Sequence, residues 1–269
     1  MNFLFKKNKI LLVGLVLLFF LLGITFILPM IIPQKASMWN YTYKSFLEPG
    51  SSHWIGTDSL GHDVFSYLIR GTVTSLYIAV ISVSISFIIG VVLGILGGYF
   101  SGFWDIITNF ICDYLIVFPD FILAFLIMFF LKTGIYQLIM VLSICYLPTF
   151  IKNIKNATIK ITRQDFVKNA LALGANHSYI IRKHIFPHLL PTLFIRIALS
   201  LSSVILVASS FGFIGIGLDN SIPEWGLLLS LNKTYIYIYP RLFFFPMMFI
   251  IFTNLAFNFI AEGINEFIE

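Results

Sequence analysis

Residues 71–104 read GTVTSLYIAVISVSISFIIGVVLGILGGYFSGFW and contain no Asp, Glu, Lys or Arg. A helix needs about 20 apolar residues to cross a hydrocarbon core roughly 30 Å thick, and this stretch exceeds that length. A charge-free run of this size is typical of a membrane-spanning helix. The stretch therefore predicts a helical membrane protein.

The composition of the whole chain supports this prediction. Of the 269 residues, 59% are hydrophobic and 17% aromatic, whereas only 11% are charged. Soluble domains carry about 25% charged residues because their surface is hydrated. The composition excludes a cytosolic enzyme, a nucleic-acid-binding domain and a disordered chain. Because the lipid bilayer is the expected surroundings, the net charge of +5 concerns orientation and not nucleic acid.

Six segments are long and apolar enough to be membrane spans, so we expect an all-α, polytopic fold. The expected spans are residues 10–32, 71–104, 106–131, 134–151, 189–213 and 242–261. They divide the chain into an N-terminal transmembrane helix (1–33), an extracytosolic segment (34–70) and a core (71–269) with a long loop at 152–188. Both cysteines, Cys112 and Cys145, lie in apolar runs and predict neither a disulfide framework nor a metal site.

Basic residues indicate the orientation. Ten Lys and Arg residues lie before the first span or in the 152–188 loop, and six lie in the segments on the other side. Because cytosolic loops carry the excess of Lys and Arg, we expect both termini and this loop in the cytosol.

Some residues within the spans stand out. Gly90, Gly94 and Gly98 are spaced by four, which lets a second helix approach closely. Glycines tolerated without special packing are the alternative.

Three ionisable residues lie inside the expected spans, where such groups mark a transport pathway or an ion pair. They are Asp113, Asp120 and Arg196. Asp113 and Arg196 each lie seven residues into a span from its cytosolic end, about 10 Å deep, so we expect them to meet or to line one wet cavity. In the alternative, Arg196 extends to the cytosolic surface while Asp113 faces water alone.

The 152–188 loop contains two short helical patterns. In the first, Phe166, Ala170 and Leu173 fall on one face, and Gly174 follows where a helix would end. The second runs from about residue 178 to Pro187, and prolines at 187 and 191 disfavour its continuation into the fifth span. We expect a docking element on the cytosolic side. An amphipathic pair lying on the membrane surface is the alternative.

The loop resembles the "EAA" loop of ABC importer permeases, through DFVKNALALGA at 165–175 and HIFP at 184–187. Three further segments are similar to the second permease of dipeptide, oligopeptide and nickel importers. They are HWIGTDSLGHD at 53–63, FIGIG at 213–217 with PEWG at 223–226, and LAFN at 255–258. The sequence departs from the family where Glu-Ala-Ala is Lys168-Asn169-Ala170 and where Arg of the Gly-Arg-Asp motif is His62.

The resemblance implies a permease that works by alternating access in a bacterial inner membrane. Its implied partners are a second homologous permease, two ATPase subunits and an extracytosolic solute-binding protein. The residues implied in contact with the ATPase are Phe166, Lys168, Asn169, Ala170, Leu173, Gly174 and Pro187. The sequence has no phosphate-binding loop of the type GxxxxGK[ST]. We therefore expect no catalytic residue, no metal and no cofactor in this chain, with ATP-Mg bound by the partner subunits.

Other functions remain open at this point. Asp113 and Asp120 would also suit a secondary transporter or channel, although neither repeats nor broken helices stand out in the sequence. His184 and His188 have the i, i+4 spacing of metal ligands, but Pro187 lies between them and no third ligand is near. Within the resemblance, a di- or oligopeptide is the first expectation for the substrate, and nickel or a metal chelate is the alternative.

Overall fold

The structure, a computed structural model, describes residues 9–27, 44–131, 133–219 and 221–268. Apart from an isolated bridge between Thr57 and Asp63, these residues form helices and connections and no strand. The helices are α2 (Lys9–Phe26), α4 (Val64–Tyr99), α5 (Phe103–Ile116), α6 (Asp120–Phe130), α7 (Ile135–Thr162), α8 (Asp165–Ala172), α9 (His177–Ile180), a π turn (Ile181–Ile185), α10 (Phe186–Ile214), α11 (Trp225–Asn232), a short 3₁₀ turn (Lys233–Tyr235) and α12 (Arg241–Ile268).

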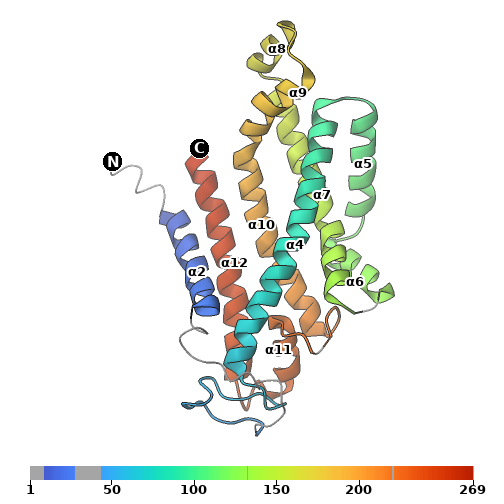
Figure 1. Cartoon of the computed structure of the whole chain (residues 1–269). Helices are drawn as coiled ribbons and strands as arrows, with labels where there is room; N and C mark the ends of the chain where they lie inside the picture. Colours follow the sequence, from blue (N-terminus) through green and yellow to red (C-terminus); the bar gives the residue numbers. More distant parts are fainter. Residues whose placement is uncertain (1–8, 28–43, 132, 220, 269) are drawn as a thin grey trace.

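The all-α membrane fold is confirmed. Among the described residues, five helical segments are long and apolar enough to cross a membrane, and α5 with α6 forms a bent pair that makes a sixth candidate. Residues 28–43, which include the end of the first expected span and the start of the 34–70 segment, lie outside the described residues. Figure 1 shows α8 and α9 at one end of the bundle and α11 at the other, hereafter the α8 end and the α11 end.

Helices α4 and α7 form the central pair, and they run parallel. The Ser82 hydroxyl donates to the Ile139 carbonyl and the Ser86 hydroxyl to the Ser143 carbonyl, each pair 57 residues apart. Hydroxyl groups bonded across a helix interface satisfy polar atoms that lipid could not. The same contact continues to the α8 end through glycines at 90, 94 and 98.

Close approach of these two helices requires the glycines. A Cβ at Gly94 would lie 2.8 Å from the Ile154 Cβ, one at Gly98 would lie 2.7 Å from the Lys155 carbonyl oxygen, and one at Gly90 would collide with Phe150. Any larger residue would separate α4 from α7.

The third span is not the single helix that we expected over 106–131. Helices α5 and α6 meet at an angle of 81°. Pro119 explains the break, because proline lacks an amide hydrogen and disfavours helical geometry in the residue before it. We expected no broken helix from the sequence, and this expectation was wrong.

The fourth and fifth spans are longer than expected. Helix α7 continues to Thr162, and α9, the π turn and α10 form one continuous helical rod from His177 to Ile214. The non-helical part of the 152–188 loop is therefore confined to short turns around α8. Pro187 and Pro191 do not end the rod. The π turn lies just before Phe186, and its wider hydrogen-bond spacing accommodates Pro187, which has no amide hydrogen to donate.

Helix α2 packs against α12 at the side of the bundle (Figure 1). The two run antiparallel, since Gly14 lies against Ala256 and Gly263 against Leu11. The core divides into a large cluster along the spans and a smaller cluster at the α8 end. The smaller one, hereafter the α8-end cluster, consists of Val91, Ile95, Ile154, Ile161, Val167, Ile180, Ile185, Leu189 and Leu193.

Candidate coupling site and polar groups of the bundle

Helix α8 is fixed to the bundle by its inner face. Val167 is fully buried in the α8-end cluster, and Phe166 and Ala170 pack against that cluster. Of the apolar stripe that we expected, Phe166 and Ala170 are therefore half-buried against the chain's own helices, and Leu173 is exposed. Their apolar face covers the chain's own helices, as burial of the most hydrophobic side of a short helix demands.

Two histidines hold Phe166 in place. The Phe166 ring stacks on His188, with centroids 4.9 Å apart, and lies 5.8 Å from His184. The Nδ1 atom of His188 is 2.6 Å from the His184 carbonyl oxygen. The i, i+4 histidines thus pack α8 onto the π turn and the start of α10.

The outer face of α8 carries the residues left for a partner. Lys168 and Asn169 are exposed, and Leu173 is 88% exposed. The Lys168 ammonium lies 3.3 Å from the Asp165 carboxylate within the same helix. Gly174 follows with φ +78°, and a Cβ there would meet no other atom. This surface, hereafter the outer α8 face, consists of Lys168, Asn169, Leu173 and Gly174.

A second contact joins this end to α4. The Tyr99 hydroxyl, at the end of α4, lies 2.7 Å from Nδ1 of His177, the first residue of α9. Pro187 is exposed in the first turn of α10, where the helical rod continues and does not break as we expected. The α8 end is therefore tied to α4, α7 and α10 together.

The charges within the spans do not pair as expected. Asp113 of α5 lies 3.5 Å from Lys152 of α7, and their side chains are 70% and 44% exposed. Arg196 is on α10, and its Nε is buried without a hydrogen-bond partner among the described residues. The expected Asp113–Arg196 pair is wrong because α5 packs on α4 and α7. Equal depth did not indicate which side of the bundle each residue faces.

Lys155, which the sequence analysis counted only as a loop charge, anchors α5. Its side chain is buried and forms an ion pair with Asp105. Its ammonium also donates to Asn109 at 2.7 Å and to Thr108 at 3.2 Å. A buried ammonium requires such partners. In the sequence, the i, i+3, i+4 spacing of these three polar residues of α5 was the signal that could have indicated a shared partner.

At the α11 end, a buried carboxylate joins three helices. Glu224 is 1% exposed and precedes α11. It accepts hydrogen bonds from the Ser209 hydroxyl of α10 at 3.0 Å, from the Ser75 hydroxyl of α4 at 3.3 Å and from the Leu227 amide at 2.9 Å. Burial raises the pKa of this carboxyl group, and the hydrogen bonds partly oppose that shift.

Small residues make this junction possible. A Cβ at Gly226 would collide with the Ser209 carbonyl, and one at Gly212 would collide with the Glu224 carboxylate. The PEWG segment therefore meets α10 at Ser209 and Gly212, just before the FIGIG segment, which fixes α11 between α4 and α10.

The segment before α4 is a compact cap. Asp63 accepts hydrogen bonds from the Ser66 amide and hydroxyl, so it caps the start of α4. It also lies 3.0 Å from His53, and His62 lies 3.0 Å from Asp58. Histidine in place of the usual arginine at 62 thus still contacts a carboxylate. Arg241, at the start of α12, donates to the carbonyls of this segment and closes the cap.

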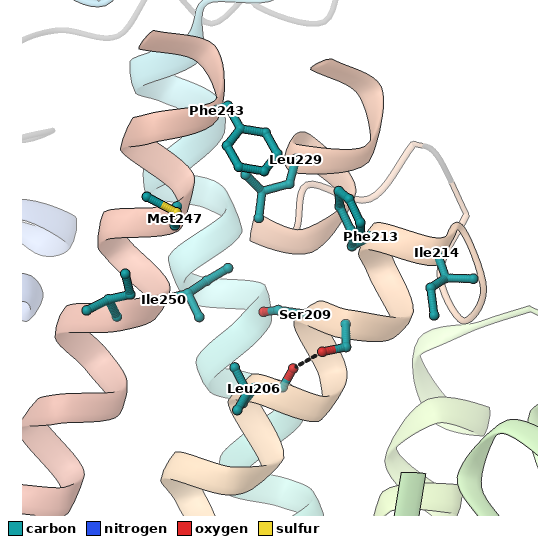
Figure 2. Close-up of a pocket in the computed structure, with 10 residues that line it drawn as sticks. Leu206, Ser209, Phe213, Ile214, Leu229, Phe243, Met247 and Ile250 are labelled. Carbon is teal, nitrogen blue, oxygen red and sulfur yellow. Dashed lines mark hydrogen bonds between the residues drawn. The ribbon is translucent and has the colours of Figure 1, made fainter. Parts of the chain in front are cut away.

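Figure 2 shows a pocket of about 340 Å³ between α10, α11 and α12. Phe213, Leu229 and Phe243 lie around one end of it. Ser209, which binds Glu224, is one of its few polar lining residues. None of its lining residues is charged and most are apolar, so the pocket suits an apolar group.

Residues 90–269 match the family described as binding-protein-dependent transport system inner membrane component. Residues 4–49 match the N-terminal TM domain of oligopeptide transport permease C.

Curated relatives cover most of the chain. The glutathione transport system permease protein GsiD of Pectobacterium atrosepticum is 30% identical over 221 residues, which are 82% of this chain and 73% of that protein. The same protein of Salmonella typhimurium is 36% identical over equal shares. The dipeptide transport system permease protein DppC of Alkalihalophilus pseudofirmus is 29% identical over 98% of this chain and 86% of its own length.

A solved structure shows the same fold. The inward-facing MetNI methionine ABC transporter contains a chain that matches with a TM-score of 0.55 and 20% identity, over 74% of this chain and 96% of that one. The chain therefore belongs to the family of binding-protein-dependent transport system inner membrane components, and it is a multi-pass permease subunit of an ABC importer in a bacterial plasma membrane.

Proposed function

We propose that this permease imports di- or oligopeptides, together with a second homologous permease, two ATPase subunits and an extracytosolic solute-binding protein. The relatives named above support a peptide, because one is named for a dipeptide and two for glutathione, itself a tripeptide.

The outer α8 face is the observation that carries the proposal. It presents Leu173 almost fully to solvent, beyond the ends of the long spans. This leucine, at the end of a projecting helix, leaves apolar surface that a protein contact would remove from water. The ATPase subunit is the partner that we assign to it, so the α8 end lies in the cytosol.

The packing of α8 explains how such a contact would move the spans. Val167 of α8, Ile154 of α7 and Leu189 of α10 are all fully buried in the α8-end cluster. Close-packed interiors transmit displacement rather than absorb it. When the ATPase pair closes on ATP, the displaced α8 carries α4, α7 and α10 with it, and the cavity between the two permeases changes the side to which it opens.

Nucleotide chemistry belongs to the partners in this proposal. ATP-Mg binds and is hydrolysed in the ATPase subunits, and this chain supplies no catalytic group. Its contribution is the binding of the ATPase and the two alternative packings of its spans.

Labelling tests the proposed orientation. The two natural cysteines are first removed. A single cysteine is then introduced either at Asn176, between α8 and α9, or at Ser221, before α11. An impermeant thiol reagent should reach position 221 from outside the cell and position 176 only after the membrane is opened. Labelling of both from one side would contradict the orientation.

Uptake tests the function. The complete transporter is reconstituted in vesicles with its solute-binding protein outside and ATP inside. We expect a labelled dipeptide to accumulate only with ATP, and excess nickel not to compete. ATP-dependent nickel uptake without peptide uptake would contradict the substrate assignment.

A further inference from the structure

The break in the third span is uncovered within this chain. Residues 117–119 join α5 to α6, and at the break Phe118 is 45% exposed and Val117 more so. Helix α6 begins after Pro119 without a side-chain cap. Since the first amide groups of a helix have no partner within it, the break carries polar backbone groups in need of hydrogen bonds.

The break lies near the middle of the apolar part of the bundle. The Cys112 sulfur is 3.9 Å from the Pro148 carbonyl oxygen of α7. Because a Cβ at Gly90 of α4 would collide with Phe150 of the parallel α7, Pro148 is level with about Ile88. Ile88 belongs to the charge-free stretch 71–104, and the break follows Cys112 by five residues, about 8 Å along the same stretch.

Lipid is an unsuitable neighbour for this surface. Irregular backbone at membrane depth occurs only where protein or a water-filled cavity covers it. Beside the break lie the exposed Asp113–Lys152 pair and the exposed Asp120, and charged groups within spans face the interior of an assembly or water. The backbone groups at the break and the charged side chains beside it therefore both indicate that protein or water, and not lipid, covers this surface.

We infer that this surface, formed by Asp113, residues 117–119 and Asp120 with Lys152 of α7, faces the second permease across the wetted translocation path. The inference rests on the proposed two-permease importer. The negative charge of Asp113 is balanced by Lys152, whereas Asp120 has no ion-pair partner among the described residues. The surface is thus acidic at the break, and the second permease presents Lys, Arg or other hydrogen-bond donors to it.

Helix α2 gives the contrasting surface. Phe19 is 67% exposed on a helix that has no charge after Lys9 and packs on α12. A regular apolar helix satisfies its own backbone, so lipid suits this side.

Photocrosslinking compares these two surfaces directly. Benzoylphenylalanine replaces Phe118 or, as the matched control, Phe19, in the complete transporter with a tagged second permease. We expect irradiation at 118 to join this chain to the tagged permease and irradiation at 19 to yield no such product. Adducts from 19 but not from 118 would overturn the inference.

Peptide uptake by the same preparations separates this inference from the proposed function. If ATP-dependent uptake is intact and 118 gives no adduct with the second permease, the interface is wrong and the function stands. If the unmodified complex shows no ATP-dependent uptake, the proposed function itself fails.

A charge change gives a second measurement in case the aromatic analogue disturbs folding. Asp120→Lys should lower co-purification of the second permease at least tenfold, while Asp120→Asn should retain most of it. Equal recovery for both variants would contradict the expected donors on the partner.

Discussion

Removal of the Glu224 carboxylate should loosen the attachment of α11 to the spans. Glu224→Ala leaves the Ser209 and Ser75 hydroxyls and the Leu227 amide without their acceptor. A lost N-cap costs about 1 kcal/mol, and each buried donor left unpaired costs about 1–3 kcal/mol. Because the Ser75 contact is long and both hydroxyls can rotate to other acceptors, we expect a loss of about 3 kcal/mol in total.

Glu224→Gln is the matched control, because its amide oxygen can still accept at the start of α11. Its expected loss is about 1 kcal/mol, since one amide oxygen replaces two carboxylate oxygens and the Ser209 and Ser75 hydroxyls must turn to accept from the amide NH₂ group. Thermal unfolding of the detergent-solubilised transporter measures both variants. Equal midpoints for Ala and Gln would refute the role assigned to these hydrogen bonds.

The pH dependence gives an independent check. Burial raises the folded-state pKa of Glu224 above its ordinary value of 4.5. The folded state therefore binds the proton more readily, and stability from this group falls as the pH rises from about 4.5 through the folded-state pKa. Glu224→Gln should remove this slope. A variant with an unchanged slope would show that another group titrates.

Four further changes test other contacts. Gly174→Val should leave the protein in the membrane but uncouple ATP hydrolysis from uptake, since a branched residue in the left-handed region costs about 1–2 kcal/mol; normal uptake would refute the turn. Lys168→Glu should weaken binding of the ATPase measured by co-purification, and unchanged binding would show that this charge does not face the partner. Lys155→Met should destabilise the attachment of α5 by about 2 kcal/mol, seen as faster proteolysis in the α4–α5 connection; wild-type rates would argue against the anchor. Gly94→Leu should prevent assembly of a stable permease, whereas the same change at the uncrowded Gly23 should be tolerated; equal expression of both would contradict close packing of α4 on α7.

The sequence was sufficient for features that depend on spacing along one helix. Charge-free length predicted the spans, and glycines at every fourth position predicted a close approach that the structure places between α4 and α7. The positive φ of Gly174 follows from its place at a helix end.

The sequence could not predict features that depend on which neighbouring helix each side chain faces. Asp113 and Arg196 had matching depth, but depth does not indicate the neighbouring helix, and Asp113 meets Lys152 instead. Phe166 shared a stripe with Leu173, yet the α8-end cluster takes Phe166 and leaves Leu173 outside. The π turn before Pro187 was missed because its adjustment of the helix leaves no mark in apolar periodicity.

Replacement of Leu173 tests whether the outer α8 face binds the ATPase. Burial of a leucine stabilises a contact by about 1.5–3 kcal/mol, so Leu173→Asn should weaken ATPase binding roughly 10- to 100-fold and abolish ATP-driven uptake. Leu60→Asn, at an exposed leucine before α4, is the control and should change neither quantity. Wild-type ATPase affinity in Leu173→Asn, measured on the purified permease pair, would contradict the account.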